Sequence, residues 1–463
     1  MSAPLIWIGL PLLISAIIWY QQNKTLPRIW LPIAASTILL LLAMFVPIDE
    51  RERILGIPIE IKSSLMIFGR NFSLGNEDRP ILIFLYSLAL FWFFGADVAK
   101  VKSSFQPVAM VMVALFVASL AVKPFLYAAL IIELCVLLSV FMLVSDDKDI
   151  NQGLMRFLVF QTLALPFILI AGWSAAGFEA NPANELLLSQ TIIMLGLGFV
   201  FALATFPFYT WVPQLTQSTN PYVVGFLLSF LPIVGLLLLL GFIDTYAWLR
   251  DFELTYTALR LIGSMMTITG GIWVIFQKNL ARIFGYAVII ENGFTLIAIG
   301  FSRHLGLENF SLILLPRIIS LALLSLGLAV IGKNRSCDLD EIKGLITEYP
   351  FVSAAIGVAI FSLGAFPILA GFPVKMILFE GIAGISLNTA LWIFVGNLGL
   401  LFSGFRVIAV IMNKKEIIWK INENWQQVLF LSIGILANVA IGLFPHLLLS
   451  GMINILNSFE NLI

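Results

Sequence analysis

The sequence predicts an all-α integral membrane protein with about 14 membrane-spanning helices. Two observations support this fold class. First, hydrophobic residues make up 60% of the 463 positions and charged residues only 11%, whereas soluble domains have about 45–50% apolar and about 25% charged residues. The mean hydropathy is accordingly high, at +1.03. Second, apolar stretches of roughly 17–25 residues, the length that crosses a hydrocarbon core about 30 Å thick, recur along the whole chain.

The expected helices follow one another with short connections. The first begins near the N-terminus and lacks the basic segment and cleavage site of a signal peptide, so it is interpreted as a membrane helix. The expected ranges are 4–20, 29–46, 79–99, 105–121, 124–144, 153–173, 189–210, 220–242, 258–277, 283–301, 309–331, 350–386, 388–412 and 427–449.

Two of these ranges contain residues that interrupt helices. In the twelfth, Pro367, Gly371 and Pro373 are expected to break the helix within FPILAGFP, and the seventh ends in FPFYTWVP before Asn220-Pro221 opens the next helix. Inside a membrane, such breaks survive only where the freed backbone groups meet protein or water. The two breaks therefore mark regions where an ion path is expected.

The longest polar stretch, from Pro47 to Arg79, alternates apolar and polar residues in GIPIEIKSSLMIFG. Alternation with a period of two is typical of strands, so a small external β-hairpin is expected near residues 50–78. A disordered loop is the alternative.

Basic residues in the loops indicate the orientation. By the positive-inside rule, the loops with the larger basic set face the cytoplasm, which places both termini on the non-cytoplasmic side of the inner (plasma) membrane. The larger set comprises Lys24, Arg28, Lys100, Lys102, Lys148, Lys278, Arg282, Lys333, Arg335, Lys343, Lys414, Lys415 and Lys420, and the smaller set comprises Lys123, Arg250, Arg260 and Arg303.

Several classes of function are disfavoured by composition. The 26 basic residues balance 26 acidic residues, which argues against nucleic acid as a partner. Cys135 and Cys337 have no CxxC spacing, and His304 and His446 form no ligand pair, so neither a metal nor a cofactor is expected. The sequence contains no recognisable catalytic motif of its own, which makes a stand-alone enzyme improbable.

A few charged residues lie at mid-membrane depth. Glu133 is central in PFLYAALIIELCVLLSVFMLV, Lys375 follows the Gly/Pro break, and Arg317 lies in LILLPRIISLALL. A charge at this depth costs at least about 2.5–3.5 kcal/mol on insertion scales, so it usually faces a bundle interior or a wet cavity. Glu291 and Glu380 are the carboxylates expected near Lys375. We interpret these five residues as candidates for a proton path.

Each candidate has a structural alternative. Glu133, buried without a cation, favours its neutral form and suits either a proton acceptor or a structural hydrogen bond. Lys375 is either a proton relay or a fixed ion-pair partner of Glu380 or Glu291. Arginine does not usefully deprotonate, so a Glu291–Arg317 pair is interpreted as an electrostatic gate, with an inert buried pair as the alternative.

Five segments of the chain carry recognisable motifs: FPFYTWVPQL (206–215), QKNLARIFGYAVIIENGF (277–294), IKGLITEYP (342–350), LGAFPILAGFPVK (363–375) and GLFPHLLL (442–449). These motifs resemble those of the antiporter-like membrane subunits of respiratory complex I, membrane-bound hydrogenases and multisubunit cation/proton antiporters. The resemblance covers most of the chain from the fourth expected helix onward, and the IENG sequence is most similar to the hydrogenase-linked members.

The resemblance implies two inverted five-helix repeats, helices 4–8 and 9–13, with broken helices 7 and 12. The corresponding organisation is 1–103 for the N-terminal helices and hairpin, 104–242 and 258–412 for the repeats, and 427–463 for the C-terminal helix. It further implies a proton-translocating, non-redox subunit of an NADH:quinone oxidoreductase-type or hydrogenase-type respiratory assembly. Its partners would be other membrane subunits, and its substrate protons or, in the antiporter alternative, Na⁺.

The chain departs from the family pattern in its first half. The lysine of the seventh helix falls at Ala202, and that of the eighth falls at Ile233 or Val234. Glu133 and Lys375 match the two end positions of the family's charged axis, while the middle is missing. A degenerate structural subunit without transport is therefore a further alternative.

Overall fold

The structure is a computed structural model of the chain. It describes residues 2–21, 25–54, 57–67, 69–144, 152–301, 303–333, 335–413, 421–446 and 450–462. Five residues used for the orientation prediction lie outside the described residues: Lys24, Lys148, Lys414, Lys415 and Lys420. For Arg28 and Arg303, only the backbone is described.

The described chain is mostly helical, which confirms the predicted class. Ten of its helices are long and apolar enough to cross a membrane, and every range expected from hydropathy overlaps a long or a shorter apolar helix. The helices are α1 (Leu10–Tyr20), α2 (Thr25–Phe45), α3 (Arg79–Val98), α4 (Phe105–Ala121), α5 (Ala128–Leu143), α6 (Gln152–Ala180), α7 (Glu185–Ala202), α8 (Trp211–Ser218), α9 (Pro221–Thr245), α10 (Ala247–Arg250), α11 (Glu253–Ile275), α12 (Leu280–Ile299), α13 (Arg303–Gly332), α14 (Pro350–Leu363), α15 (Gly371–Ile385), α16 (Leu387–Met412) and α17 (Trp425–Leu443).

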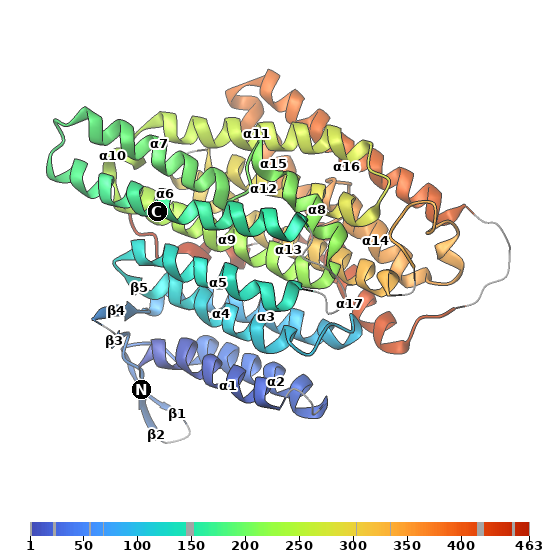
Figure 1. Cartoon of the computed structure of the whole chain (residues 1–463), viewed down its shortest axis with the longest axis horizontal. Coiled ribbons are helices and arrows are strands. Elements are labelled where there is room, and N and C mark those ends of the chain that lie inside the picture. The colour runs from blue at the N-terminus through green and yellow to red at the C-terminus, as the bar shows by residue number, and fades with distance from the viewer. Residues whose placement is uncertain are drawn as a thin grey trace.

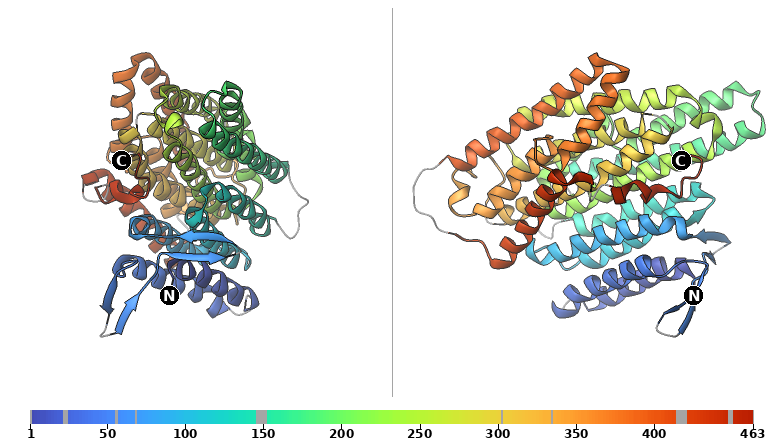
Figure 2. Two further views of the ribbon diagram at one scale, coloured as in Figure 1. Left: turned by 90° about the vertical axis from the view of Figure 1, so that its left-hand side faces the viewer. Right: turned by 180° about the vertical axis from the view of Figure 1, so that it is seen from behind.

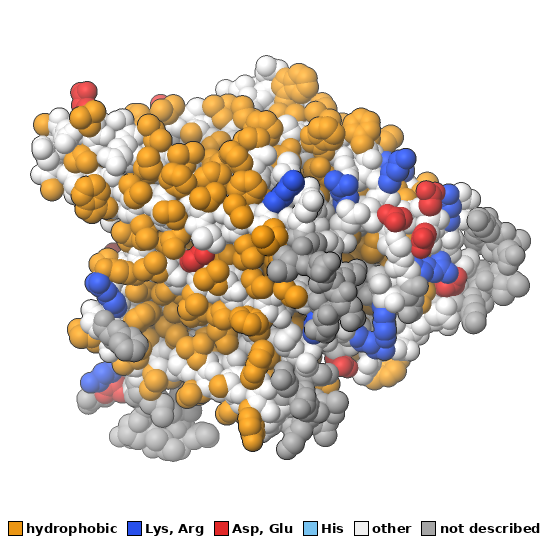
Figure 3. Space-filling model, in the orientation of Figure 1, with side chains coloured by type: hydrophobic (Ala, Val, Ile, Leu, Met, Phe, Trp, Pro, Cys, Tyr) orange, Lys and Arg blue, Asp and Glu red, His pale blue; other side chains and the backbone are white. Residues whose placement is uncertain are grey.

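The long helices run side by side across the molecule, with α1 and α2 at one edge (Figures 1 and 2). The helices α9, α12 and α13 form the interior. In the most apolar 18-residue stretch of each helix, the buried share is 100% for α9, 94% for α12 and 89% for α13. Hydrophobic side chains cover most of the face in Figure 3, and charged side chains gather at one end. A surface of this kind requires lipid or partner helices. The chain is a multi-pass integral membrane protein.

The predicted strand structure near residues 50–78 is present as two antiparallel hairpins rather than one. The first pairs β1 (Arg51–Ile54) with β2 (Ile57–Glu60). The second pairs β3 (Ser64–Ile67) with β4 (Arg70–Ser73), and β4 also pairs with the two-residue β5 (Val122–Lys123). The alternative of a disordered loop is wrong. The strands lie at the end of the molecule where both chain termini are found (Figure 1).

Both expected helix breaks are present, and the helix before each break ends with the same hydrogen-bond pattern. After α7, the N–H groups of residues 203–205 donate to the carbonyls of 199–201, and after α14, residues 364–366 donate in the same way to 360–362. The central residue of each trio is an alanine in the left-handed conformation, with φ of 49° and 58°. Each bond recurs 161 positions later, as from 203 to 364. Left-handed caps of this kind satisfy carbonyls at a helix end.

The second break lies slightly earlier than predicted. It spans residues 364–370, so Gly371 and Pro373 belong to the first turn of α15, where proline is tolerated because its missing N–H has no helical acceptor. Gly371 is required by a close approach, since a Cβ there would lie 2.0 Å from the Ser362 carbonyl oxygen. The first break spans residues 203–207 and is followed by a short 3₁₀ turn and α8. Asn220 caps α9 by accepting a hydrogen bond from the Tyr222 N–H, as its position before Pro221 suggests.

Candidate functional site

A buried ion pair lies at the break between α14 and α15. Glu291 of α12 is 1% exposed and Lys375 of α15 is 2% exposed. The Lys375 Nζ donates to Glu291 Oε1 over 2.6 Å, to the Leu363 carbonyl, and to Asn397 Oδ1 over 3.4 Å. This confirms Glu291, rather than Glu380, as the ion-pair partner of Lys375.

The helix break supplies several groups of this site. Because α14 ends at Leu363, the carbonyls of its last turn have no partners within the helix. The Lys375 ammonium donates a hydrogen bond to the Leu363 carbonyl, and Asn397 Nδ2 of α16 donates to the Gly364 carbonyl over 2.7 Å. The ammonium also lies 4.2 Å from the centroid of the Phe294 ring. Several oxygens and an aromatic face therefore stabilise a charge that the surrounding apolar helices alone could not solvate.

Arg317 lies next to the pair but does not contact Glu291. The side chain is 1% exposed, and its Nη2 donates to Asn292 Oδ1 over 2.5 Å. Consecutive residues of a helix point about 100° apart, so Glu291 turns toward Lys375 while Asn292 turns toward Arg317. The expected Glu291–Arg317 ion pair is wrong for this reason. The guanidinium is instead a fixed positive charge beside an ion pair.

Two donors of Arg317 have no partner in the described part of the chain, and a small cavity lies beside the same side chain. Its Nε and Nη1 have no hydrogen-bond partner in the described residues of the chain. A cavity of about 10 Å³ is lined by Arg317, Glu291, Lys375, Ser320 and Ser362, among others. This volume is close to the minimum for a single water molecule.

A second polar cluster joins the break to the C-terminal helix. Ser320 Oγ of α13 donates to Ser362 Oγ of α14 over 2.9 Å, and Asn438 Nδ2 of α17 donates to Ser320 Oγ over 2.9 Å. The backbone N–H groups of Gly371 and Ala370 donate to Ser362 Oγ and Asn438 Oδ1. All three side chains are buried. The cluster therefore provides partners for the backbone groups freed by the break.

The sequence reasoning missed these neutral groups. Asn292, Asn397 and Asn438 stand as single amides within apolar helical ranges, in IIENGF, FVGNLG and ILANVA. An amide buried in an apolar helix requires a hydrogen-bond partner, and that requirement is the signal that could have identified them.

Glu380 lies apart from the buried pair. It is exposed on α15, and no ion pair or hydrogen bond of its side chain is present within the described residues. Five residues correspond to about 500° of rotation in a helix, which turns Glu380 about 140° away from Lys375. The alternative of a Lys375–Glu380 ion pair is therefore wrong, although a role for Glu380 in a proton path stays a prediction.

Glu133 occupies a different environment in the first half of the chain. Its half-buried carboxylate accepts a hydrogen bond over 2.8 Å from Thr162 Oγ1, which links α5 to α6. A cavity of about 20 Å³ is lined by Glu133, Gln161 and Ala202, among others, and none of its lining residues is basic. Gln161 Nε2 donates to the Ala202 carbonyl over 3.0 Å. Where the family pattern has a lysine, this chain thus has Ala202, a small cavity and a hydrogen bond from Gln161 to the Ala202 backbone.

The central helix of the first half, α9, has no charged residue between Pro221 and Ile243. Ile233 and Val234, the residues at the position of the eighth-helix lysine, are buried inside α9. Polar contacts of the kind seen around Lys375 are absent from these two apolar side chains. The charged groups that the structure brings together are therefore Glu291, Lys375 and Arg317, and Glu133 lies outside that cluster.

Comparison with known proteins identifies the family of this chain. Residues 157–401 match the family model described as NADH:quinone oxidoreductase/Mrp antiporter, TM. The chain belongs to this family. The matched segment contains both helix breaks and all three residues of the charged cluster.

The curated relatives are distant, and the matches cover only about half of each relative. A subunit N of NADH-quinone oxidoreductase from Dehalococcoides mccartyi is 27% identical over 293 residues, covering 59% of this chain and 58% of the relative. The putative antiporter subunit mnhD2 of Staphylococcus epidermidis is 28% identical over 233 residues, covering 49% of this chain and 46% of the relative. The chain spans about half the length of the curated relatives it matches.

Solved structures share the fold over the whole chain. A chain of the archaeal membrane-bound sulfane sulfur reductase superposes with a TM-score of 0.83 at 14% identity, covering 100% of both chains. A chain of respiratory complex I from Thermus thermophilus superposes with a TM-score of 0.72 at 17% identity, covering 99% of both. These similarities place the helices in a fold common to subunits of membrane complexes.

Proposed function

We propose that this chain is a proton-translocating, non-redox membrane subunit of a complex-I-like or membrane-hydrogenase-like assembly in the inner membrane. The observation that carries the proposal is the buried Glu291–Lys375 ion pair, with its Nζ–Oε1 distance of 2.6 Å, at the break of a membrane helix. Ionisable residues at such depth are costly, and a broken helix frees backbone groups that water or ions can use.

The contacts around the pair suggest how a proton would move. A proton arriving on Glu291 neutralises the carboxylate, and the Lys375 ammonium then loses its counter-ion. The ammonium can still rest on the Leu363 carbonyl and Asn397 Oδ1, or release a proton toward the next acceptor. The neighbouring Arg317 keeps its charge throughout, because a guanidinium does not usefully deprotonate, and it stands beside the pair as a fixed positive charge.

The chain is proposed to contain two inverted five-helix repeats, 104–242 and 258–412, between an N-terminal segment (1–103) and a C-terminal segment (427–463). The recurrence of the helix-end bonds after 161 positions supports this organisation. The same offset relates Arg317 to Arg156 and Lys375 to Gln214, and Arg156 Nη1 donates to Gln214 Oε1 over 3.0 Å. At the corresponding positions the first repeat therefore has an arginine–glutamine hydrogen bond, without a carboxylate–ammonium pair.

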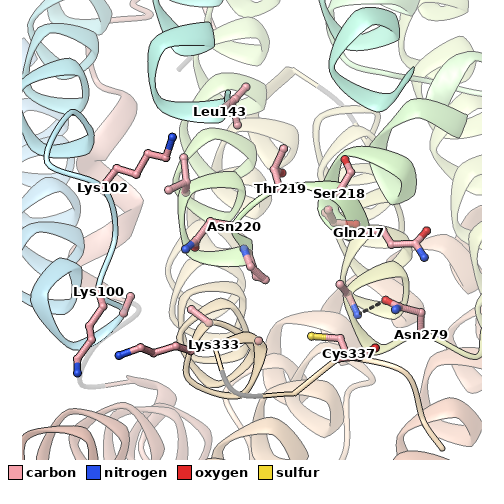
Figure 4. Close-up of a pocket in the computed structure, with 18 of the residues that line it drawn as sticks. Lys100, Lys102, Leu143, Gln217, Ser218, Thr219, Asn220, Asn279, Lys333 and Cys337 are labelled. Carbon is pink, nitrogen blue, oxygen red and sulfur yellow. Dashed lines mark hydrogen bonds between the residues drawn. The ribbon is translucent and has the colours of Figure 1, made fainter. Parts of the chain in front are cut away.

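Orientation and partners belong to the same proposal. The two termini lie at the end of the molecule that holds the strands, which precede α3 (Figure 1). The loops with Lys100, Lys102, Lys333 and Arg335 lie together at the opposite end of α3 (Figure 4). The positive-inside rule then puts the basic loops in the cytoplasm and the termini outside. Partner membrane subunits would cover some of the apolar surface, and redox chemistry in those partners would drive the charge movement.

A degenerate subunit without transport is the second candidate. Ala202, Ile233 and Val234 favour it, because the first half has no buried cation near Glu133. Under this alternative, the Glu291–Lys375 pair only holds the broken helix in place.

A cation/proton antiporter is a third candidate, supported by the relative named as a putative antiporter subunit. The oxygens of Glu291, Leu363 and Asn397 lie close together, but all three accept hydrogen bonds from the Lys375 ammonium. A Na⁺ ion would have to displace a covalently tethered ammonium, so the geometry favours protons.

An ion-replacement experiment tests the proposed function. The assembled complex is reconstituted into proteoliposomes, and substrate-driven proton movement is followed with a pH-sensitive dye in Na⁺ buffer and in choline buffer. Proton movement is expected to be the same in both buffers and to be abolished by a protonophore. A strict requirement for Na⁺, together with uptake of radioactive Na⁺, would contradict the proton assignment and favour the antiporter.

A further inference from the structure

A large polar pocket lies apart from the proton site, where several loops meet (Figure 4). Its volume is about 600 Å³, which falls within the range of about 300–1,000 Å³ typical of ligand pockets. It is lined by the α3–α4, α8–α9, α11–α12 and α13–α14 connections and by the last residues of α5. The pocket shares no lining residue with the cavity beside Glu291 and Lys375.

The lining is strongly basic. Lys100, Lys102, Lys333 and Arg335 line it, and among the described residues of the lining only Asp338 is acidic. Arg335 pairs with Glu348 outside the pocket, and Asp338 accepts hydrogen bonds from neighbouring Asn279 and Ser336. The Lys102 ammonium donates to the Val144 carbonyl.

Lys100 and Lys333 are the two remaining lysines of the lining. Within the described residues of the chain, no carboxylate lies within ion-pair distance of Lys100 or Lys333. Their ammonium groups lie next to one another (Figure 4), and this proximity lowers the pKa of Lys333. Two positive charges held together without an acid repel one another, and a bound anion would remove that repulsion.

The backbone adds positive potential to the same space. The helices α9 and α12 start at the pocket, and their caps Asn220 and Asn279 line it. The positive ends of both helix dipoles therefore point toward the pocket. The cap side chains already accept hydrogen bonds from first-turn N–H groups, so this contribution comes mainly from the dipoles.

We propose that this pocket binds a phosphate-bearing anion, with Lys100 and Lys333 as its direct contacts. Their paired ammonium groups match the several oxygens of a phosphate, to which lysine binds as a point charge. The apolar side chains of Met142, Leu143 and Val144 line the same pocket and suit the glycerol or acyl portion of an anionic phospholipid. A soluble phosphate compound offers the same charged group without that apolar portion.

The test uses the purified full chain in phosphatidylcholine nanodiscs. One arm measures the binding of short-chain phosphatidylglycerol by native mass spectrometry, with short-chain phosphatidylcholine as its reference. The other arm titrates pyrophosphate by calorimetry. The pocket variant is Lys100→Asn with Lys333→Gln, because Lys100 has φ of 50° and asparagine tolerates that left-handed conformation. The matched control is Lys278→Gln with Lys343→Gln, which removes the same charge outside the pocket lining.

The wild type is expected to bind at least one of the two probes. The pocket variant should lose about tenfold or more in affinity for that probe, and the control variant should lose less than about twofold. Binding in the lipid arm alone identifies a phospholipid headgroup, and binding of pyrophosphate identifies a soluble phosphate compound. The proposal is overturned if neither probe binds the wild type, or if the control variant loses as much affinity as the pocket variant. The single Lys333→Gln variant, in an exposed turn, repeats the comparison if the double variant does not fold.

Discussion

Replacing Lys375 with alanine is expected to reduce proton pumping by the assembled complex to below about a tenth of its wild-type level. The substitution leaves Glu291 as a buried carboxylate without its ammonium partner, and removing one member of a buried pair typically costs about 3–5 kcal/mol. The proposed relay would then lack the ammonium that releases the proton. The measurement is the ratio of protons moved to electrons transferred in proteoliposomes.

A second substitution separates proton relay from structural support. Lys375→Arg keeps a positive charge beside Glu291 but cannot usefully deprotonate. The relay account expects an assembled complex with little pumping, whereas a purely structural pair would let this variant pump normally. Lys343→Ala is the matched control, because it removes an exposed lysine that pairs only with Asp340 near the surface. Normal pumping by both Lys375 variants would rule out the relay.

Arg317→Leu is expected to slow proton movement by about tenfold. The guanidinium is the nearby fixed positive charge in this region of the core, and its loss changes the electrostatic potential at the Glu291–Lys375 pair. It also leaves Asn292 without its hydrogen-bond donor. The initial rate of proton movement, measured at constant electron transfer, should fall while the complex stays assembled.

Two further variants make the Arg317 result specific. Arg317→Lys keeps the charge and should retain most of the rate. Arg156→Leu removes the arginine that lies 161 positions earlier, where it is exposed and donates a hydrogen bond to Gln214, and it should have a small effect. A wild-type rate in Arg317→Leu would mean that the arginine is a packing element without influence on the ion pair.

Much of the fold could be predicted from the sequence because membrane helices are specified by local composition. The apolar stretches indicated the helices, and the Gly/Pro-rich FPILAGFP segment indicated the broken one. Alternation in GIPIEIKSSLMIFG indicated strands. The pairing of β4 with β5 could not be predicted, since β5 has two residues and lies about 50 positions further along the chain.

The site was harder to predict because it depends on which way each side chain points. Hydropathy placed Glu291, Arg317 and Lys375 at similar depth, but only the rotation of α12 decides that Glu291 meets Lys375 and Asn292 meets Arg317. The polar partners Asn397, Ser362 and Asn438 carry no charge and so did not attract attention. The basic pocket combines residues from four connections, and no local pattern brings Lys100 and Lys333 together.

The central claim is that Glu291 exchanges a proton during turnover. Infrared difference spectroscopy of the assembled complex, with and without its driving substrate, measures this directly through the carboxyl stretching band of a protonated side chain. The account predicts a difference band that disappears in Glu291→Gln and persists in Glu133→Gln. A spectrum in which no carboxyl band depends on Glu291, recorded while the complex pumps protons, would contradict it.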